Sequence, residues 1–225
     1  KVAEWPVGAA APPDVLGQAV DMALGDDATV YLLDQQPGRA VVLRPDGRWG
    51  KPFGDIGSGP DRVTQPGAIG VDSAHDRVYV SDLGTERLVT FDRQGKYLQS
   101  IPDVYAVDVS VRPDGMIWVA DHLAGAARLL SPEGKELERL GSYGPGEDDQ
   151  SLALVSVVED QGGRLWVADQ GGRRLRAFER GAGGVFDRVR TVDLGGNTYS
   201  GCDGARLQAL ADDVILAGAC ILEGG

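Results

Sequence analysis

The chain repeats one short pattern four times, and this repeat limits the fold more than any other feature of the sequence. Each copy has an apolar run that contains an aromatic residue and closes with aspartate, then a polar turn and a second apolar run. The copies are VYLLDQQPGRAVVL (30–43), RVYVSDLGTERLVTF (77–91), MIWVADHLAGAARLL (116–130) and RLWVADQGGRRLRAF (164–178). Their closing aspartates, Asp34, Asp82, Asp121 and Asp169, are 48, 39 and 48 residues apart. Repeats of this length are typical of folds that stack copies of one supersecondary unit.

Each repeat divides into four short apolar runs joined by short turns. In the second repeat the runs are 68–72, 77–82, 87–91 and 96–101, and the turn DRQG joins the last two. Gly and Pro favour tight reversals of the chain, so consecutive runs are expected to form antiparallel hairpins. Four antiparallel strands in a repeat of this length describe one blade of a β-propeller. The predicted fold class is therefore all-β, a β-propeller of four-stranded antiparallel blades. We call the strands of a blade a, b, c and d in chain order.

The charge balance argues against two classes of partner. The net charge is -12, and only four residues are lysine, so the basic stripe of a nucleic-acid-binding protein is missing. No apolar run approaches the roughly 20 residues that cross a bilayer, so no membrane insertion is predicted.

Two stretches of the chain resemble NHL repeats. Residues 53–98 contain, in order, Phe-Gly, a Gly-rich loop, Pro before Gly, an apolar-Val-Asp strand, Tyr-Val-x-Asp, an Arg-led strand and a Gly turn. Residues 140–178 follow the same order but lack the proline, and the first and third repeats match more weakly. The resemblance implies the NHL-repeat family of six-bladed β-propellers, in the TolB-like propeller superfamily. It implies a fold and no single function, because such propellers carry many functions.

One propeller domain is expected over residues 1–225. The predicted full blades are 19–54, 68–101, 105–141 and 155–192, and a partial fifth blade combines 205–221 with an N-terminal strand at 2–8. That strand would close the ring and hide the sheet edges. Since the resemblance implies six blades, the chain is interpreted as a fragment of a six-bladed propeller or a variant on one.

The repeated aspartates are the first candidates for a site. An Asp at a strand end readily accepts backbone N–H bonds from the turn that follows, and Arg39, Arg87 or Arg174 stands five residues later to pair with it. This structural role is the favoured interpretation. In the alternative, these carboxylates form a ring on one face that binds a cation or a basic ligand, joined by His122 beside Asp121. Long inter-blade loops on the same face add Arg62 and Tyr143 as candidate contact residues.

Strand a of each blade lines the channel of a propeller, and its carboxylates are Asp21, Asp72, Asp108 and Glu159. Asp21 and Asp108 fall at one repeat position, where the other blades have Ile69 and Ser156. A charge among apolar neighbours needs water or a partner, and a water-filled channel would supply it. No cofactor is predicted. In the alternative that these carboxylates form a metal site in the channel, calcium is the ion that they would suit.

The family resemblance also offers two enzyme classes for comparison. Lactonases of the gluconolactonase kind hold calcium with Glu, Asn and Asp, and amidating lyases of this fold hold zinc with several histidines. The histidines of this chain are His75 and His122 and its asparagine is Asn197, so neither ligand pattern is matched.

Cys202 and Cys220 are the two cysteines, and a disulfide between them is geometrically feasible if their loop folds back. Two free buried thiols are the alternative. A disulfide would indicate an extracytoplasmic location, periplasmic or secreted. Low Lys with high Arg, Gly and Ala usage indicates a GC-rich bacterial source.

These observations favour a non-catalytic binding scaffold that recognises a protein, peptide or glycan on the face that carries the loops. The alternative is a metal-dependent, lactonase-like hydrolase or lyase with its centre in the channel. A third interpretation is a piece of a larger protein with no independent function.

Overall fold

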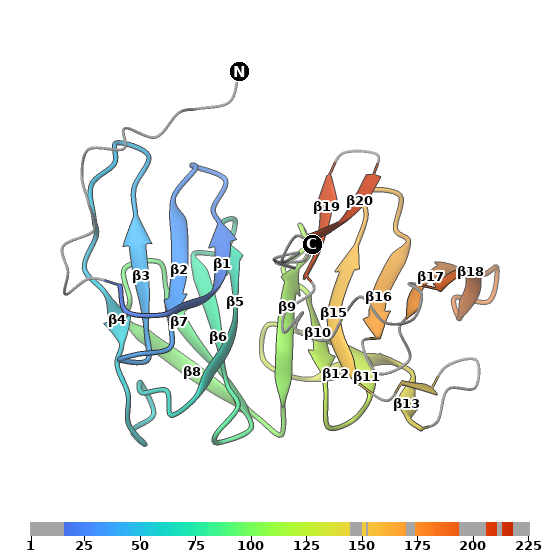
Figure 1. Cartoon of the computed structure of the whole chain (residues 1–225), viewed down its shortest axis with the longest axis horizontal. Coiled ribbons are helices and arrows are strands. Elements are labelled where there is room, and N and C mark those ends of the chain that lie inside the picture. The colour runs from blue at the N-terminus through green and yellow to red at the C-terminus, as the bar shows by residue number, and fades with distance from the viewer. Residues whose placement is uncertain are drawn as a thin grey trace, which may run out of the picture. The chain divides into compact units, whose positions relative to one another are not determined.

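The computed structural model describes residues 16–144, 150–151, 153–169, 174–193, 206–210 and 213–217. The chain divides into two compact units, 1–106 and 107–225, and each unit is described by itself. The regular elements of the described residues are β-strands, and all four four-stranded sheets are antiparallel (Figure 1). That part of the chain contains no helix long and apolar enough to cross a membrane.

Unit 1 holds two of these sheets. The first has the strand order β1-β2-β3-β4, formed by β1 (Ala19–Leu24), β2 (Val30–Asp34), β3 (Arg39–Leu43) and β4 (Phe53–Gly54). The second has the order β5-β6-β7-β8, formed by β5 (Pro66–Asp72), β6 (Arg77–Asp82), β7 (Arg87–Asp92) and β8 (Tyr97–Pro102). Because every strand pairs with its neighbour in sequence, each sheet is one blade of the predicted kind.

The turn between β7 and β8 shows why glycine is needed in these hairpins. The Gly95 N–H donates to the Asp92 carbonyl at 2.9 Å, and Gly95 has a φ of 87°. That left-handed conformation costs little only for glycine. A Cβ on residue 95 would also lie 2.5 Å from the Cβ of Phe53, which belongs to the other blade of unit 1. The turn geometry and the packing between blades therefore both require glycine here.

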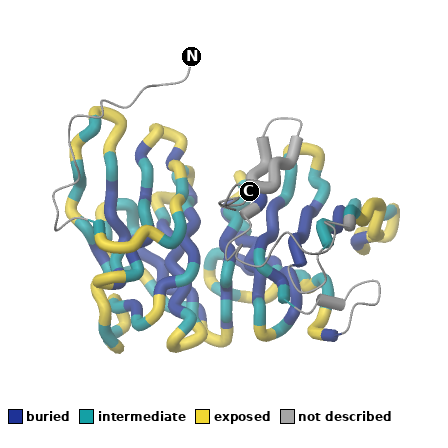
Figure 2. Tube along the Cα trace, viewed as in Figure 1, coloured by how far each residue is buried: buried dark blue, intermediate teal, exposed yellow. Residues whose placement is uncertain are grey.

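The core of unit 1 is one apolar cluster to which both blades contribute. The first blade supplies Tyr31, Leu33, Ala40, Val42 and Phe53, and the second supplies Ile69, Val78, Val80, Val89 and Phe91. Figure 2 shows the buried stretches along the strands and the exposed ones at the turns. Neither sheet could bury its apolar face alone, so the two blades stabilise each other.

Unit 2 holds the other two four-stranded sheets and two smaller ones (Figure 1). One blade is formed by β9 (Ala106–Val111), β10 (Ile117–Asp121), β11 (Ala126–Leu130) and β12 (Glu136–Leu140), and the next by β15 (Leu154–Glu159), β16 (Leu165–Asp169), β17 (Arg174–Arg180) and β18 (Phe186–Asp193). A hairpin follows, formed by β19 (Arg206–Leu210) and β20 (Asp213–Ala217). Between the two blades, β13 (Ser142–Tyr143) and β14 (Gln150–Ser151) form a short parallel pair.

Two apolar clusters join the sheets of unit 2. The first joins the two blades and includes Trp118, Leu129, Leu154, Val167 and Phe178. The second places Leu207 of β19 against Trp166 and its neighbours in the β15–β18 blade. The hairpin β19–β20 therefore packs on that blade as a following blade would.

On β12, Glu136 is held by two arginines, and this contact predicts a pH dependence. Arg139 donates to its carboxylate at 2.8 and 3.0 Å, and Arg128 donates at 2.7 Å. The hydrogen bonds from Arg139, then those from Arg128, lower the pKa of Glu136 from 4.5 to about 2 against the opposing effect of burial. A carboxyl group whose pKa is lower in the folded chain than in the unfolded chain stabilises the fold at pH values above its unfolded pKa. This stabilisation is lost as the pH falls through the folded pKa.

Glu136→Gln is therefore expected to lower the melting temperature at pH 7. The difference in melting temperature between the variant and the parent chain should shrink as the pH falls from about 4.5 towards about 2. Thermal unfolding followed by circular dichroism measures both values. Glu133→Gln is the matched control, because it removes the charge of an exposed glutamate in the turn before β12. A gap that stays constant between pH 7 and pH 3 would contradict the role given to Glu136.

The structure confirms the predicted fold class and adds details that the sequence pattern did not contain. The four sheets span 19–54, 66–102, 106–140 and 154–193, close to the predicted blades. The parallel pair β13–β14 was not predicted, because it lies in an inter-blade loop without an apolar repeat. The predicted strand at 2–8 lies outside the described residues, so ring closure and the single domain stay predictions.

Candidate functional site

The repeated aspartates end β2, β6, β10 and β16, and each is at most 4% exposed. Asp82 shows how they are used. Its Oδ1 accepts hydrogen bonds from the Thr64 N–H at 3.0 Å, the Thr64 hydroxyl at 2.6 Å and the Gln65 N–H at 2.9 Å. Its Oδ2 accepts one from the Thr85 hydroxyl at 2.5 Å. Asp82 thus links Thr64 and Gln65, which precede β5, to the end of β6.

The same arrangement recurs at two of the other repeated aspartates, Asp34 and Asp169. Asp34 accepts from the N–H groups of Gly17 at 2.9 Å and Gln18 at 2.7 Å, and Asp169 from Ala153 at 3.3 Å. The predicted bonds from the following turn are confirmed at Asp34, through Gln36, and at Asp121, through Ala124. The donors that precede strand a were not predicted, since they lie 16 to 18 residues before the aspartate that binds them.

The predicted arginine partners are also confirmed. The pairs are Arg39–Asp34 at 4.0 Å, Arg87–Asp82 at 3.4 Å and Arg174–Asp169 at 3.4 Å. In the third repeat, where Ala126 replaces the arginine, Arg128 contacts Asp121 at 2.6 Å. These bonds give the conspicuous residues of the repeat a structural role. Ligand binding by Asp34, Asp82, Asp121 or Asp169 stays a prediction.

The other predicted contact residues lie in different surroundings. The His122 ring donates through Nδ1 to the Leu154 carbonyl at 3.1 Å, which links β15 to the end of β10. Arg62 pairs with Asp55 at 3.3 Å and has a side chain that is 43% exposed. Tyr143 lies in β13 and is 63% exposed. Arg62 belongs to unit 1, whereas His122 and Tyr143 belong to unit 2.

The strand-a carboxylates join neighbouring blades. Asp21 in β1 accepts the Ile69 N–H of β5 at 2.9 Å. Asp108 in β9 accepts the Ser156 hydroxyl and, at 3.0 Å, the Val157 N–H, both in β15. The Ser156 Oγ in turn accepts the Leu207 N–H of β19 at 2.9 Å. A metal bound here would compete with these bonds.

Two further predictions concern metals and cysteines. Within the residues that the structure describes, no three His, Cys, Asp or Glu side chains gather so that they could hold a metal ion. Cys202 and Cys220 both lie outside those residues, so their disulfide stays a prediction.

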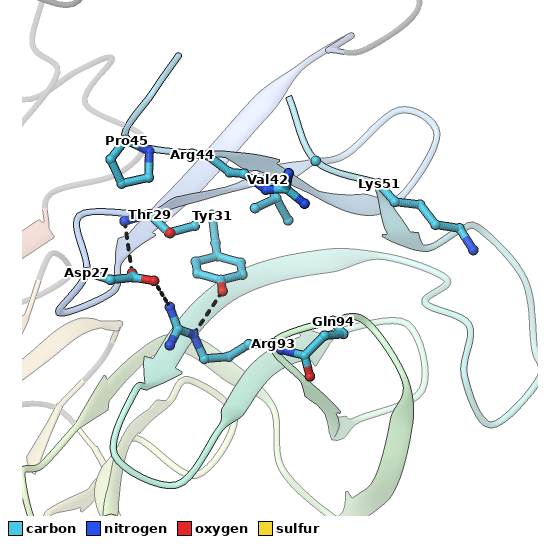
Figure 3. Close-up of a pocket in the computed structure, with 10 residues that line it drawn as sticks. Asp27, Thr29, Tyr31, Val42, Arg44, Pro45, Lys51, Arg93 and Gln94 are labelled. Carbon is cyan, nitrogen blue, oxygen red and sulfur yellow. Dashed lines mark hydrogen bonds and ion pairs between the residues drawn. The ribbon is translucent and has the colours of Figure 1, made fainter. Parts of the chain in front are cut away.

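A pocket of about 420 Å³ opens in unit 1 where three turns meet (Figure 3). They are the a–b turn of the first blade (25–29), its c–d connection (44–52) and the c–d turn of the second blade (92–95). Its polar and charged side chains are Asp27, Thr29, Tyr31, Arg44, Lys51, Arg93 and Gln94. Three cations and one carboxylate thus line one pocket of a chain whose net charge is -12.

The repeat pattern of the sequence does not indicate this pocket. Its side chains come from turns far apart in the chain, and only the packing of the two blades brings them together. A weak signal was available, because cationic residues recur in the c–d turns RPDGR (44–48) and DRQGK (92–96). A second pocket of about 200 Å³ shares Lys51 and Gln94 with it and is also lined by the predicted contact residue Arg62.

The loop 55–66, which connects the two blades of unit 1, is held from several sides. Ile56 and Val63 form a bridge within the loop, and the Val63 N–H donates to the Asp55 carbonyl at 3.0 Å. The Arg87 guanidinium donates to the carbonyls of Gly59 at 3.0 Å and Arg62 at 2.8 Å. The aspartate that ends β6 holds the last residues of the loop. The loop is therefore ordered by residues of the repeat, while the Ile56 side chain on it is 59% exposed.

Comparison with known proteins shows the fold. No protein-family model and no curated protein sequence matches the chain. Solved structures that resemble it include a streptogramin B lyase, at 13% identity and a TM-score of 0.65, covering 94% of this chain and 65% of that one. Virginiamycin B lyase from Staphylococcus aureus matches at 13% identity and a TM-score of 0.61, covering 89% and 61%. The hydrazine synthase of Kuenenia stuttgartiensis matches at 14% identity and a TM-score of 0.62, covering 84% and 53%.

This chain therefore spans between about half and two thirds of the length of these three structures. At such identities the likeness concerns the fold, an all-β architecture of antiparallel four-stranded blades like that of the lyase propellers.

Proposed function

We propose that the chain is an NHL-type propeller that acts as a non-catalytic binding module, and that loop 55–66 recognises a peptide segment of a partner protein. The observation that carries the proposal is the construction of this loop. Arg87 and Asp82, two residues of the repeat, hold its backbone, and its outward side chains are left to make contacts. A preordered loop loses little conformational entropy on binding, which favours recognition.

The outward side chains of the loop suit a protein surface. Ile56 offers an apolar contact, and the partly exposed pair Arg62–Asp55 offers polar contacts beside it. Protein interfaces combine an apolar centre with a polar rim in this way. A glycan ligand is the other outcome that the test below distinguishes.

The catalytic alternative has less support from the side chains. The carboxylates that a metal-dependent hydrolase or lyase would use, Asp21 and Asp108, accept hydrogen bonds from the next blade. The resemblance to lyases is a resemblance of fold, so it supplies no argument for a reaction here. An extracytoplasmic location remains part of the proposal and rests on the two cysteines.

Selection of random peptides displayed on phage, run beside a glycan array on the same purified chain, tests the binding module. Selected peptides should bind the parent chain, and Ile56→Asp should weaken that binding about tenfold or more, because it places an uncompensated charge at the apolar contact. Val185→Asp makes the same change at a residue of unit 2 that is 70% exposed, and it should leave the affinity unchanged.

Three results would count against this proposal. Peptide binding that survives Ile56→Asp would move recognition away from loop 55–66. Glycans bound in place of peptides would replace the ligand class. A chain that binds neither class would refute the binding module.

A further inference from the structure

The pocket of about 420 Å³ in unit 1 contains a firmly held arginine, Arg93 (Figure 3). The Arg93 Nη2 donates to Asp27 Oδ2 at 2.6 Å, and its Nε donates to the Tyr31 hydroxyl oxygen at 3.1 Å. The side chain of Arg93 is 18% exposed, and it is carried by the second blade but held by residues of the first. The Asp27 carboxylate is held in turn by the Thr29 N–H at 3.1 Å.

The charges of this pair persist over the ordinary pH range. Burial opposes charge on Arg93, but the hydrogen bonds with Tyr31 and Asp27 outweigh it and raise the pKa of Arg93. Burial likewise opposes charge on Asp27, but the hydrogen bonds from Thr29 and Arg93 outweigh it and lower the pKa of that carboxyl. Arg93 and Asp27 therefore neutralise each other, and the other cations set the net charge of the pocket.

Those other cations are Arg44 and Lys51. Both line the pocket and are exposed, and no ion pair joins either of them to another described residue. Figure 3 shows Arg44 beside Val42 and Lys51 farther along the same blade. In contrast Arg48, the other cation of this turn, pairs with Asp46 at 3.7 Å and does not line the pocket. The pocket thus carries a net positive charge of two side chains.

Apolar surface completes the pocket. Val42, Pro45 and the ring of Tyr31 line it together with the charged groups. The volume of about 420 Å³ falls in the range of small-molecule sites, roughly 300 to 1,000 Å³. An apolar wall in a pocket that cations also line suits a ligand with a carbon skeleton and an anionic group.

We propose that this pocket binds a small organic anion, with its carboxylate or phosphate paired to Arg44 and Lys51 and its carbon skeleton against Val42 and Pro45. Arg93 supplies further N–H donors from a fixed position, and guanidinium groups match the geometry of carboxylates and phosphates. The site is separate from the exposed side chain of Ile56, so it extends the function beyond peptide recognition.

Titration of the full chain with phenyl phosphate, benzoate and benzamide, followed by isothermal calorimetry at low ionic strength, tests the site. Phenyl phosphate or benzoate should bind saturably, and neutral benzamide of similar shape should bind at least about tenfold more weakly. Arg44→Glu should weaken anion binding about tenfold or more, because it removes a cation and adds a repelling charge. Arg48→Glu makes the same charge change in the same turn and should alter the affinity less than about twofold.

The outcomes separate the proposal from its competitors. Equal loss of binding in Arg44→Glu and Arg48→Glu would mean general attraction to the turn and would overturn the site. Equal binding of benzamide would overturn the anionic ligand class. The proposal as a whole would be overturned if neither anion bound saturably at concentrations up to about 10 mM. Preference between phenyl phosphate and benzoate identifies which anionic group the pocket accepts. Ile56→Asp leaves this binding intact if the two sites are independent.

Discussion

Replacing Asp82 by alanine is expected to lower the free energy of unfolding by about 3–5 kcal/mol, the range seen when one partner of a buried charged contact is removed. The carboxylate is fully buried and accepts hydrogen bonds from Thr64, Gln65 and Thr85. It also forms an ion pair with Arg87. Without it, the Thr64, Gln65 and Thr85 donors lose their acceptor, and Arg87, which keeps its bonds to two carbonyls, loses its anionic partner. Removing the acceptor of buried donors costs more than the bonds contribute, because those donors no longer reach water.

Urea denaturation measures this change, and hydrogen exchange of the Thr64 and Gln65 amides localises it to the entry of the blade. Asp46→Ala, at a carboxylate that is 54% exposed, is the control and should cost less than about 0.5 kcal/mol. A loss under about 1 kcal/mol for Asp82→Ala, the usual size of a single point change, would contradict the role given to the repeated aspartates.

The same carboxylate implies acid sensitivity. Burial alone would raise the pKa of Asp82, but the hydrogen bonds from Thr64, Thr85 and Gln65 outweigh it and lower that pKa below its ordinary value of 3.8. The stabilisation by Asp82 is therefore complete above about pH 4 and is lost as the pH falls through the folded pKa. The difference between the parent chain and Asp82→Ala should narrow in that window.

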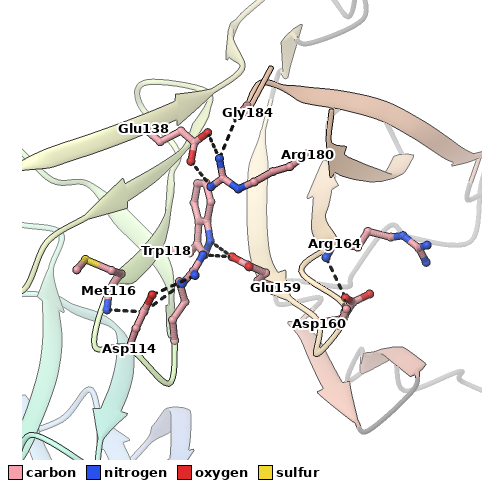
Figure 4. Close-up of polar contacts among 11 residues, drawn as sticks. Asp114, Met116, Trp118, Glu138, Glu159, Asp160, Arg164, Arg180 and Gly184 are labelled. Carbon is pink, nitrogen blue, oxygen red and sulfur yellow. Dashed lines mark hydrogen bonds and ion pairs between the residues drawn. The ribbon is translucent and has the colours of Figure 1, made fainter. Parts of the chain in front are cut away.

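Trp118→Ala is the second change for which a large effect is expected, a loss of about 3–5 kcal/mol for a large buried aromatic. Trp118 is 0% exposed in the cluster that joins the two blades of unit 2, and its ring contacts Phe186 with centroids 5.9 Å apart. Its Nε1–H donates to Glu159 at 2.7 Å (Figure 4). Arg112 donates to the same carboxylate oxygen at 2.6 Å. Truncation would leave a cavity and remove a donor from this carboxylate.

Trp118→Phe separates these two contributions. It keeps most of the ring volume and removes the hydrogen bond, so it should cost about 1–3 kcal/mol. Denaturant unfolding followed by near-ultraviolet circular dichroism measures both variants. If alanine and phenylalanine at residue 118 cost the same, packing between the blades would not be what Trp118 provides.

The aromatic register was visible in the sequence because it is local. Tyr31, Tyr79, Trp118 and Trp166 each stand three residues before a repeated aspartate, and all four are at most 9% exposed in the structure. Strand alternation and turn chemistry are also local, so four-stranded antiparallel blades could be predicted without coordinates. The ion pairs from the arginines five residues later followed from the same hairpin geometry.

The partners of the strand-a carboxylates could not be predicted in this way. Asp21 binds an amide 48 residues later in the chain, and Asp108 binds a serine hydroxyl at the same separation. From the sequence, each of these carboxylates is a charge among apolar neighbours, and the expected partner was channel water or a metal ion. The structure instead supplies donors from the next blade, since adjacent inner strands approach closely enough for side chains to bond across them.

The candidate sites likewise differ in whether their residues belong to one hairpin or to two blades. The blade, its turns and the positions of its buried aspartates and aromatics follow from the amino-acid pattern, because they depend on residues within one hairpin. The contact of Asp27 with Arg93, 66 residues away, and the pocket lined by Arg44 and Lys51 arise only when the blades pack together. The physical reason is that contacts between blades depend on how two separate sheets pack, and no spacing within one repeat encodes that packing.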